Sequence, residues 1–394
     1  MASTRQSDSN LFCGKMSKTV SKPHGGRLVS VGKLNTESSG KGDLTLEVDS
    51  RTAINLFLMK TGIFSPLTSF NTREDYDSIL REQRMGNGIP WSIPIILNIA
   101  PGKFMVSDGD VIILTRNGHN LAEMYIDDKW EFNKGEFIDR IFGTRDIMHP
   151  GVAKIQEMGS VILSGKVVGI SDQELPFKEY FLPPEQTRKF FQNKSWKTIA
   201  AFQTRNIPHL GHEYLQKSAL NMVDGLFINP VIGRKKAGDF SDKIIVGAYD
   251  RVLKSYYPAE RVLFSVLHYE MYYAGPREAV MHAIMRKNFG CTHFIIGRDH
   301  AGVGDYYRPY AAWKNLEAFD DLGIEIIPFE EAVYCKACKW ITTVKNCPHG
   351  EDMRIRFSAS MIREKLQRGI DIPIEIMRSD ETEWIRKQDN IFVS

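Results

Sequence analysis

Residues 198–215 read TIAAFQTRNIPHLGHEYL, and this stretch decides the fold class of the chain. The apolar run 198–202 is typical of a buried strand, and a polar loop follows it. From residue 210 onward the apolar side chains recur at helical spacing, at Leu215, Ala219 and Met222. His209 and His212 are three residues apart, so they lie on one face of that helix start. Free backbone N–H groups and the helix dipole favour an anion there. The stretch therefore predicts a strand–loop–helix unit that binds a polyphosphate.

The loop residues have the chemistry that anion binding needs. Gly211 lets a phosphate approach the backbone closely. Arg205 can donate two hydrogen bonds to a tetrahedral oxyanion, Gln203 can donate another, and Asn206 lies between that anion and the two histidines. An HxGH tetrapeptide also occurs by chance, but its place after a strand and at a helix start favours a functional interpretation.

Bulk properties exclude several classes of protein. The 394 residues suffice for two or three domains, and 51 basic against 48 acidic residues give no field that would attract nucleic acid or a membrane surface. No run of 18 apolar residues is present, and Met1–Asn10 is polar, unlike a secretion signal. Five cysteines are too few for a disulfide framework. We expect a soluble, cytoplasmic protein with no nucleic-acid or membrane partner.

The first 175 residues are predicted to form a β-rich barrel domain with helical additions. Helices are expected around Arg51–Lys60 and Thr72–Arg84. Strand-like runs include Val111–Leu114 and Ser160–Leu163. Turn signals separate such runs, for example Asn117-Gly118 and Ser107–Asp110.

From about residue 195 the pattern alternates between strand and helix, which predicts a parallel sheet with right-handed crossovers. The expected strands are 198–202, 226–232, 262–267, 292–296 and 324–327. The expected helices are 210–223, 243–256, 276–288 and roughly 307–319. We assign 176–330 to this α/β domain, with Tyr180–Gln192 as a linker, and 331–394 to a small C-terminal subdomain.

A second polar loop, GRDHAGVG at 297–304, follows the fourth strand. In a doubly wound sheet of order 3-2-1-4-5 the first and fourth strands are neighbours, and ligands bind at their carboxyl ends. Three successive polar residues, Arg298, Asp299 and His300, would be costly to bury without partners, and amides near Ala301 can complete an anion cradle. The segment Arg356–Arg363 has the pattern of a capped helix start that can close over phosphates.

The cysteine pattern indicates a structural zinc knuckle. CxxC at Cys335 and Cys338 supplies one half, and Cys347 with His349 supplies the other, although a single residue between Cys and His is short for zinc. The alternative is a surface loop of unligated thiols. Cys13 and Cys291 are isolated, and we interpret the remaining histidines as structural: His24, His119, His149, His268, His282 and His293.

Together these residues resemble the ATP sulfurylase (sulfate adenylyltransferase) family. The similarity extends over most of the chain, through 23–26, 62–67, 94–97, Asp146, 149–152, 203–212, 273–279, 297–304 and 357–363. One departure is Ser69, where the family usually has glycine, and we expect no effect on function. Some members carry a fused APS kinase domain, but the absence of a GxxxxGK[ST] loop makes us expect no kinase activity here.

The resemblance implies a PUA-like barrel followed by a Rossmann-like domain of the HxGH nucleotidyltransferase type. It implies that Gln203, Arg205 and the Ala301 amide bind sulfate, and that Thr204, Arg205 and Asn206 form the active-site motif. His209 and His212 would stabilise the transition state. ATP would be contacted by Gln203, Asn206, the two histidines, Gly297, Arg298, Asp299 and His300, with a backbone contact from Val333 to adenine.

The implied reaction is in-line attack of sulfate on the α-phosphorus of MgATP, which yields adenosine 5′-phosphosulfate (APS) and pyrophosphate and is reversible. Sulfate is already ionised, so positioning and charge neutralisation suffice without a general base. Mg²⁺ is expected to bind through phosphates and water, and Asp299 to orient its loop. The family also implies a homo-oligomer.

Two other functions fit parts of the pattern. One is another HxGH nucleotidyltransferase that acts on a phosphorylated vitamin or sugar, which the Gln-x-Arg-Asn and GRDHAG loops disfavour. The other is an RNA-binding PUA-domain protein, which the near-neutral charge disfavours.

Overall fold

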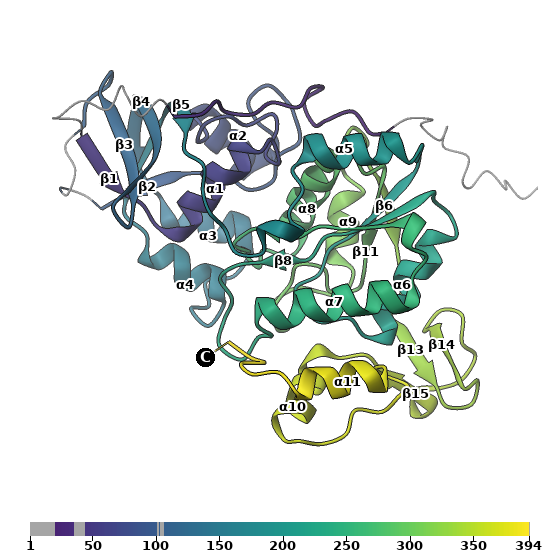
Figure 1. Cartoon of the computed structure of the whole chain (residues 1–394). Helices are drawn as coiled ribbons and strands as arrows, with labels where there is room; N and C mark the ends of the chain where they lie inside the picture. The colour runs from purple at the N-terminus through teal and green to yellow at the C-terminus, as the bar shows by residue number, and fades with distance from the viewer. Residues whose placement is uncertain (1–19, 35–43, 101, 103–105, 394) are drawn as a thin grey trace, which may run out of the picture.

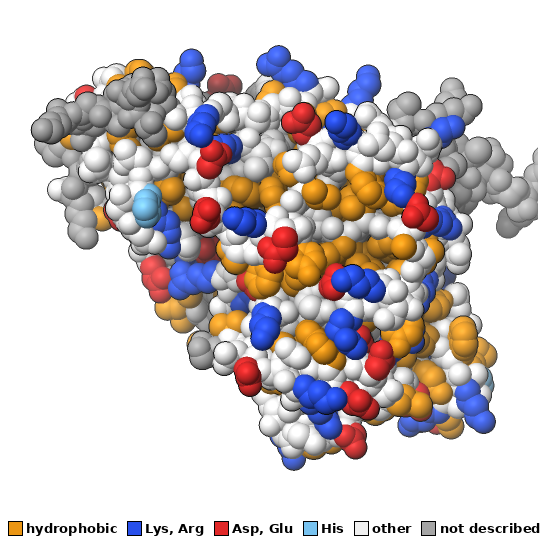
Figure 2. All heavy atoms as spheres, viewed as in Figure 1, with side chains coloured by type: hydrophobic (Ala, Val, Ile, Leu, Met, Phe, Trp, Pro, Cys, Tyr) orange, Lys and Arg blue, Asp and Glu red, His pale blue; other side chains and the backbone are white. Residues whose placement is uncertain are grey.

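The computed structural model describes residues 20–34, 44–100, 102 and 106–393 of the chain. Met1–Asn10 and Cys13, on which two of the sequence interpretations rest, lie outside the described residues. An N-terminal sheet with its helices packs beside a parallel α/β sheet, and a small antiparallel sheet and two helices follow (Figure 1). None of the described helices is both long and apolar enough to span a bilayer. Basic and acidic side chains are interspersed over the face seen in Figure 2.

The N-terminal sheet has the predicted β-rich character and contains five strands. In sheet order these are β1 Leu44–Glu47, β3 Val111–Arg116, β4 His119–Glu131, β5 Val161–Ile170 and β2 Leu97–Ile99. The β1–β3 pair is parallel, and the other pairs are antiparallel. Asn117 and Gly118 both have positive φ, at 50° and 77°, which is the backbone of a tight hairpin turn between β3 and β4. The turn predicted from the Asn-Gly pair is confirmed.

Four helices accompany this sheet: α1 Ser50–Lys60, α2 Arg73–Glu82, α3 Lys134–Phe142 and α4 Pro150–Glu157. The first two were predicted, and side-chain caps fix their starts, since Asp49 accepts a hydrogen bond from the Thr52 amide at 2.8 Å. The sequence interpretation missed α3 and α4. His149 caps α4, because its Nδ1 accepts hydrogen bonds from the amides of Gly151 and Val152. The start of α4 was missed because the capping residue is a histidine and not one of the usual caps, such as serine or aspartate.

The catalytic sheet is entirely parallel, as predicted. Its order is β12 Glu325–Pro328, β11 His293–Ile296, β6 Ile199–Phe202, β7 Gly225–Ile228 and β9 Val262–Phe264. When these five strands are numbered in chain order and read from the β9 edge, their order is the predicted 3-2-1-4-5. The expected neighbours β6 and β11 therefore pair directly. Two expected strands are interrupted, because the chain leaves the sheet at Pro230 and after Phe264. It then forms a separate parallel pair, β8 Val231–Ile232 with β10 Leu267–His268.

The crossover helices are α6 Leu210–Leu220, α7 Asp242–Tyr256, α8 Pro276–Phe289 and the short α9 Ala311–Leu316, with a 3₁₀ turn at Ala259–Arg261. The interpretation of Tyr180–Gln192 as a linker was wrong. A 3₁₀ turn at Lys178–Tyr180 leads into α5 Pro184–Asn193, because proline is tolerated at a first helical position. Phe191 of α5 is fully buried in the catalytic core.

The C-terminal segment forms a second small sheet and two helices. Strands β14 Trp340–Thr343, β13 Ala332–Cys335 and β15 Arg354–Arg356 are antiparallel, and a 3₁₀ turn (Glu351–Met353), α10 Ala359–Gln367 and α11 Ser379–Arg386 complete the chain. Ile362, Ile376 and Ile385 are fully buried in one apolar cluster with Ala200 and Leu226 of the parallel sheet. This segment is therefore packed onto the catalytic domain, while its boundary at residue 331 stays a prediction.

Candidate active site

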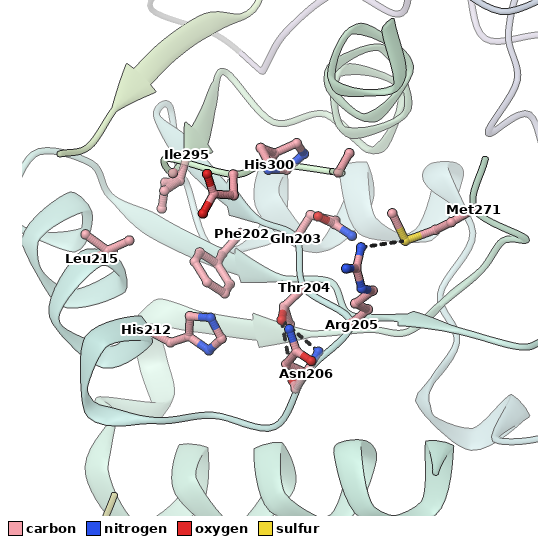
Figure 3. A pocket seen from close by; sticks show the side chains of 13 residues that line it. Phe202, Gln203, Thr204, Arg205, Asn206, His212, Leu215, Met271, Ile295 and His300 are labelled. Carbon is pink, nitrogen blue, oxygen red and sulfur yellow. Dashed lines mark hydrogen bonds between the residues drawn. The ribbon is translucent and has the colours of Figure 1, made fainter. Parts of the chain in front are cut away.

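The two polar loops singled out in the sequence meet in one cavity. β6 and β11 pair in register, His293 with Ala200 and Phe294 with Ala201, so both strands end at the same edge of the sheet. The carboxyl ends of these strands border a cavity of about 690 Å³, a volume that includes space open to solvent. Its lining comprises Phe202, Gln203, Thr204, Arg205, Asn206, His212, Leu215, Met271, Ile295, Gly297, Asp299, His300 and Ala301 (Figure 3).

Arg205 joins the two loops. Its Nη2 donates to the carbonyl oxygen of Gly302 at 3.1 Å, and its guanidinium lies 5.0 Å from the ring centroid of Tyr273. Its Nη1 also lies 4.0 Å from the sulfur of Met271, a weak acceptor, so most of the five guanidinium N–H donors are still available to a ligand. Thr204 holds the loop, since its Oγ1 accepts from the Asn206 amide at 3.0 Å. The Arg205 guanidinium is therefore held in place by Gly302 and Tyr273, and Arg205 lines the cavity.

Ala301 has a backbone conformation unusual for alanine. Its φ is +56°, in the left-handed region, and its carbonyl accepts from the Gly275 amide at 3.1 Å. Among residues 20–34, 44–100, 102 and 106–393, no acceptor pairs with its own amide. The residue is buried, and it is one of those that line the cavity. An amide held this way is suited to a small anion.

The two histidines of the HxGH motif stack on each other at the start of α6. Their ring centroids are 3.7 Å apart, and Nδ1 of His209 caps the helix by accepting from the His212 amide at 3.2 Å. A ring whose Nδ1 accepts must carry its proton on Nε2, so His209 has a donor left for a ligand. Burial, and then the neighbouring His212, hold the pKa of His209 well below 6.5. Burial also lowers the pKa of His212 to about 4, so both rings are neutral at pH 7.

Gly211 has a packing role that the sequence interpretation did not anticipate. A Cβ built on Gly211 would lie 2.7 Å from the ring of Phe357, well inside contact distance. Phe357 in turn stacks on His209, with centroids 5.4 Å apart and planes within 1°. The glycine therefore admits an aromatic side chain from the segment before α10, and the predicted phosphate approach at this position stays a prediction.

Three predicted ligand-binding residues are not part of the cavity lining: His209, Arg298 and Val333. Arg298 pairs with Asp299 at 2.6 Å and with Glu331 at 3.0 Å, so its charge is already engaged. Val333 is in the middle of β13, paired with β14 on one side and β15 on the other. Their contacts with ATP stay predictions.

The segment Arg356–Arg363 contains the predicted helix start. Ser358 caps α10 by accepting from the Met361 amide at 3.3 Å. Arg363 is bound to Asp239 at 2.5 Å and donates to Ser360 Oγ at 3.1 Å. This ion pair links α10 to the loop before α7. Closure of the segment over phosphates stays a prediction.

The sequence interpretation missed the contribution of residues 271–273. Met271 lines the cavity, and Tyr273 supports the Arg205 guanidinium. These residues follow β10, and no local pattern marks them as site residues, because neither type is characteristic of anion binding. The available signal was the YAGPREA segment, which begins at Tyr273 and lies two residues after Met271.

Cys335, Cys338, Cys347 and His349 converge, with their ligand atoms all within 4.8 Å of one another. His349 Nδ1 lies 3.4 Å from the sulfurs of Cys335 and Cys338 and 3.6 Å from that of Cys347, and the sulfurs of Cys338 and Cys347 are 3.9 Å apart. Tetrahedral zinc, with bonds of about 2.3 Å to sulfur and about 2.0 Å to nitrogen, separates such ligands by about 3.5–3.8 Å. The residues fit a four-ligand zinc ion despite the short Cys-x-His spacing.

Comparison with known proteins agrees with the geometry. A profile of a PUA-like domain matches residues 21–172, and a profile of ATP-sulfurylase matches residues 178–388. Proteins named sulfate adenylyltransferase are 45% identical in Pyrococcus abyssi (95% of this chain, 100% of that protein) and 46% identical in Hyperthermus butylicus (95% and 98%).

A third protein of that name, from Chloroflexus aurantiacus, is 40% identical over 93% of this chain and 97% of its own length. Among solved structures, a hexameric APS kinase from Thiobacillus denitrificans superposes with a TM-score of 0.72 and 21% identity, covering 93% of this chain and 68% of that one. That likeness concerns the fold alone. The extent of the matches establishes that this chain belongs to the ATP-sulfurylase family.

Proposed function

We propose that this protein is a sulfate adenylyltransferase, which converts MgATP and sulfate into APS and pyrophosphate and also catalyses the reverse reaction. The observation that carries the proposal is the convergence of the 203–206 and 297–301 loops on one cavity. Gln203, Arg205 and Ala301 are all among the residues that line this cavity, which supports the proposal. Relatives named for this activity match the chain over almost its whole length.

Sulfate is proposed to bind to Gln203, Arg205 and the Ala301 amide. The guanidinium, the NH2 of the Gln203 side chain and the backbone N–H can all donate, as a dianion requires. Arg205 is held by Gly302 and Tyr273, so little reorganisation is needed when the anion arrives. A sulfate oxygen then attacks the α-phosphorus in line with the departing pyrophosphate. Sulfate has no proton to lose at pH 7, so these residues act by positioning and by neutralising charge.

The nucleotide phosphates are proposed to lie at the N-terminus of α6. His209 and His212 are neutral in the free protein, and the Nε2–H of His209 is free to donate to a phosphate oxygen. Asn206 lies between this end and the sulfate position and can bridge both ligands. Thr204 acts through the turn that orients Arg205 and Asn206. Gly297, Arg298, Asp299, His300 and Val333 are proposed to contact the rest of ATP.

Metals are proposed at two places. Mg²⁺ would bind with ATP through phosphate oxygens and water, because Asp299 is the single carboxylate among the residues that line the cavity. Zn²⁺ would bind to Cys335, Cys338, Cys347 and His349. Four protein ligands leave no open position, so this zinc would be structural. We further propose a cytoplasmic homo-oligomer, as expected from the sequence and the family.

The reverse reaction gives the most direct test. Purified protein is supplied with APS, pyrophosphate and Mg²⁺, and ATP formation is followed with luciferase. We expect ATP that depends on all three components, and in the forward direction pyrophosphate release that depends on sulfate. Nicotinamide mononucleotide and phosphopantetheine serve as alternative acceptors. Adenylyl transfer to either of these, with none to sulfate, would contradict the proposal.

A further inference from the structure

A buried chain of three titratable side chains leads away from the cavity wall. Nε2 of His300 is 3.0 Å from Nδ1 of His282, and Nε2 of His282 is 3.8 Å from Oε1 of Glu278. Glu278 and His282 are fully buried, one turn apart on α8, whereas His300 lines the cavity. The roles proposed above use neither Glu278 nor His282.

The hydrogen bonds define where the protons lie in the free protein. Glu278 accepts from the amides of Tyr272 at 2.8 Å and Ala274 at 3.1 Å, in the first turn of α8, which favours the carboxylate. A carboxylate at this position favours the His282 tautomer with its proton on Nε2. Nδ1 of His282 then accepts, so Nε2 of His300 donates. The remaining nitrogen of His300, Nδ1, has no partner among the described residues and would present a lone pair to the cavity.

The surroundings keep both histidines neutral while the cavity holds no anion. Burial, then the charges of Arg286 and Arg205, lower the pKa of His300 to about 3, and burial with the same cations lowers that of His282. The ring of Tyr269 lies 5.6 Å from that of His282, and the ring of Phe294 lies 5.2 Å from that of His300. Burial, and then the charge of Glu278, raise the pKa of Tyr307. Burial raises the pKa of Glu278 to about 7, so its carboxylate is close to taking up a proton.

A bound anion changes this balance. A lone pair on His300 Nδ1 repels a phosphate or sulfate oxygen, whereas an N–H at the same atom attracts it. Negative charge next to Arg205 also offsets the field of the two guanidinium groups, and so favours proton uptake nearby.

Building on the proposed function, we propose that the binding of APS is coupled to the uptake of one proton by the His300–His282–Glu278 chain. The solvent proton binds Nδ1 of His300, and the Nε2 proton of His300 moves to Nδ1 of His282. Nε2 of His282 has no hydrogen-bond partner among the described residues, so its proton reaches Glu278 only when the 3.8 Å gap between them closes to hydrogen-bond distance on binding. Both imidazoles end neutral with reversed tautomers, and the carboxylate ends protonated. Glu278 and His282 are thus positioning residues that convert His300 into a donor.

Calorimetry on the full-length protein measures this proton directly. APS is a suitable probe because its phosphosulfate group has no pKa near neutrality. Its binding is titrated at pH 7.5 in PIPES, HEPES and Tris, which differ in ionisation enthalpy. The slope of binding enthalpy against buffer enthalpy should correspond to about one proton taken up. The apparent Kd should accordingly rise by up to about tenfold per pH unit on the alkaline side.

His282→Asn keeps an amide oxygen near Nδ1 that can accept from His300, but it cannot pass a proton. We expect this variant to bind APS more weakly, with a slope near zero. Glu278→Gln should behave in the same way. His24→Asn is the matched control, since His24 is an equally buried histidine outside the chain of three, and its slope should equal that of the wild type.

The outcomes separate the two proposals. If APS binds the wild type with no buffer dependence, or if the slope persists in His282→Asn, the proton relay is wrong and the proposed function stands. If APS does not bind at all, the proposed function fails and the relay fails with it. Thermal unfolding and APS stoichiometry of each variant show that the protein is folded, and Glu278→Gln provides the second test if His282→Asn does not fold.

Discussion

The ring of Phe357 lies parallel to the ring of His209, within 1° and with centroids 5.4 Å apart. The two residues are separated by almost 150 positions in the chain, and Gly211 makes the contact possible because any Cβ there would collide with the Phe357 ring. The segment before α10 therefore sets the orientation of the first histidine of the HxGH motif.

Removal of the contact between Phe357 and His209 should weaken the binding of ATP. In Phe357→Ala, His209 loses the surface that holds its ring, and we expect the KM for ATP to rise by about tenfold while the KM for sulfate changes less than about twofold. Steady-state kinetics with each substrate varied measure this. Phe392→Ala, which alters an aromatic contact with Phe240 instead, is the control. Equal increases in both KM values would argue against a specific effect on His209.

Arg205 should be essential for turnover. Its guanidinium is the group that joins both loops, so Arg205→Ala should lower kcat/KM for sulfate by about 10²–10³-fold, as for loss of a key stabilising donor. Arg205→Lys should recover little of this, because an ammonium cannot form the fork. Arg145→Ala, at an exposed arginine of the N-terminal domain, should leave kinetics unchanged. An Arg205→Ala enzyme with more than a tenth of wild-type turnover would contradict the assignment.

Acid should destabilise the fold through buried histidines. Burial lowers the pKa of His24 to about 4, whereas the unfolded chain titrates near 6.5. Between these values the unfolded state binds more protons, so stability is present above pH 6.5 and falls by about 1.4 kcal/mol per pH unit as the pH drops toward 4. Thermal unfolding between pH 7.5 and pH 4.5 should show this loss.

The contribution of His24 can be isolated by substitution. His24→Gln should give a shallower pH dependence of the unfolding temperature, even if it is less stable at pH 7.5. His119→Gln, at an exposed histidine, should keep the wild-type slope. Identical slopes in all three proteins would rule out His24 as a titrating group.

The cysteine cluster should hold one zinc per chain. Elemental analysis of protein purified without added metal should find about one equivalent, and Cys338→Ser should lower it substantially, whereas Cys291→Ala should not. Loss of zinc should lower the unfolding temperature, because β13 and β14, which flank the CxxC turn, contact α6. A full metal content in Cys338→Ser would exclude Cys338 as a ligand.

Local sequence was sufficient for the elements that contain the site. The apolar run before Gln203 and the helical spacing after His209 define a strand and a helix, and their alternation with later segments predicts the parallel order in which β6 and β11 are neighbours. The CxxC and Cys-x-His groups could likewise be recognised as one metal site. Cysteine and histidine are the usual zinc ligands, and their positions can be read directly from the sequence.

Other features depended on contacts between distant residues, which no local pattern encodes. Helix α5 forms where two prolines suggested a linker, because Phe191 is buried against the catalytic core. Gly211 accommodates Phe357, Tyr273 supports Arg205, and His282 joins His300 to Glu278. The sequence alone thus determined which groups have the chemistry to bind anions and on which elements they occur. Only tertiary packing decided their orientation and protonation, because both depend on the burial and charge of neighbours far away in the chain.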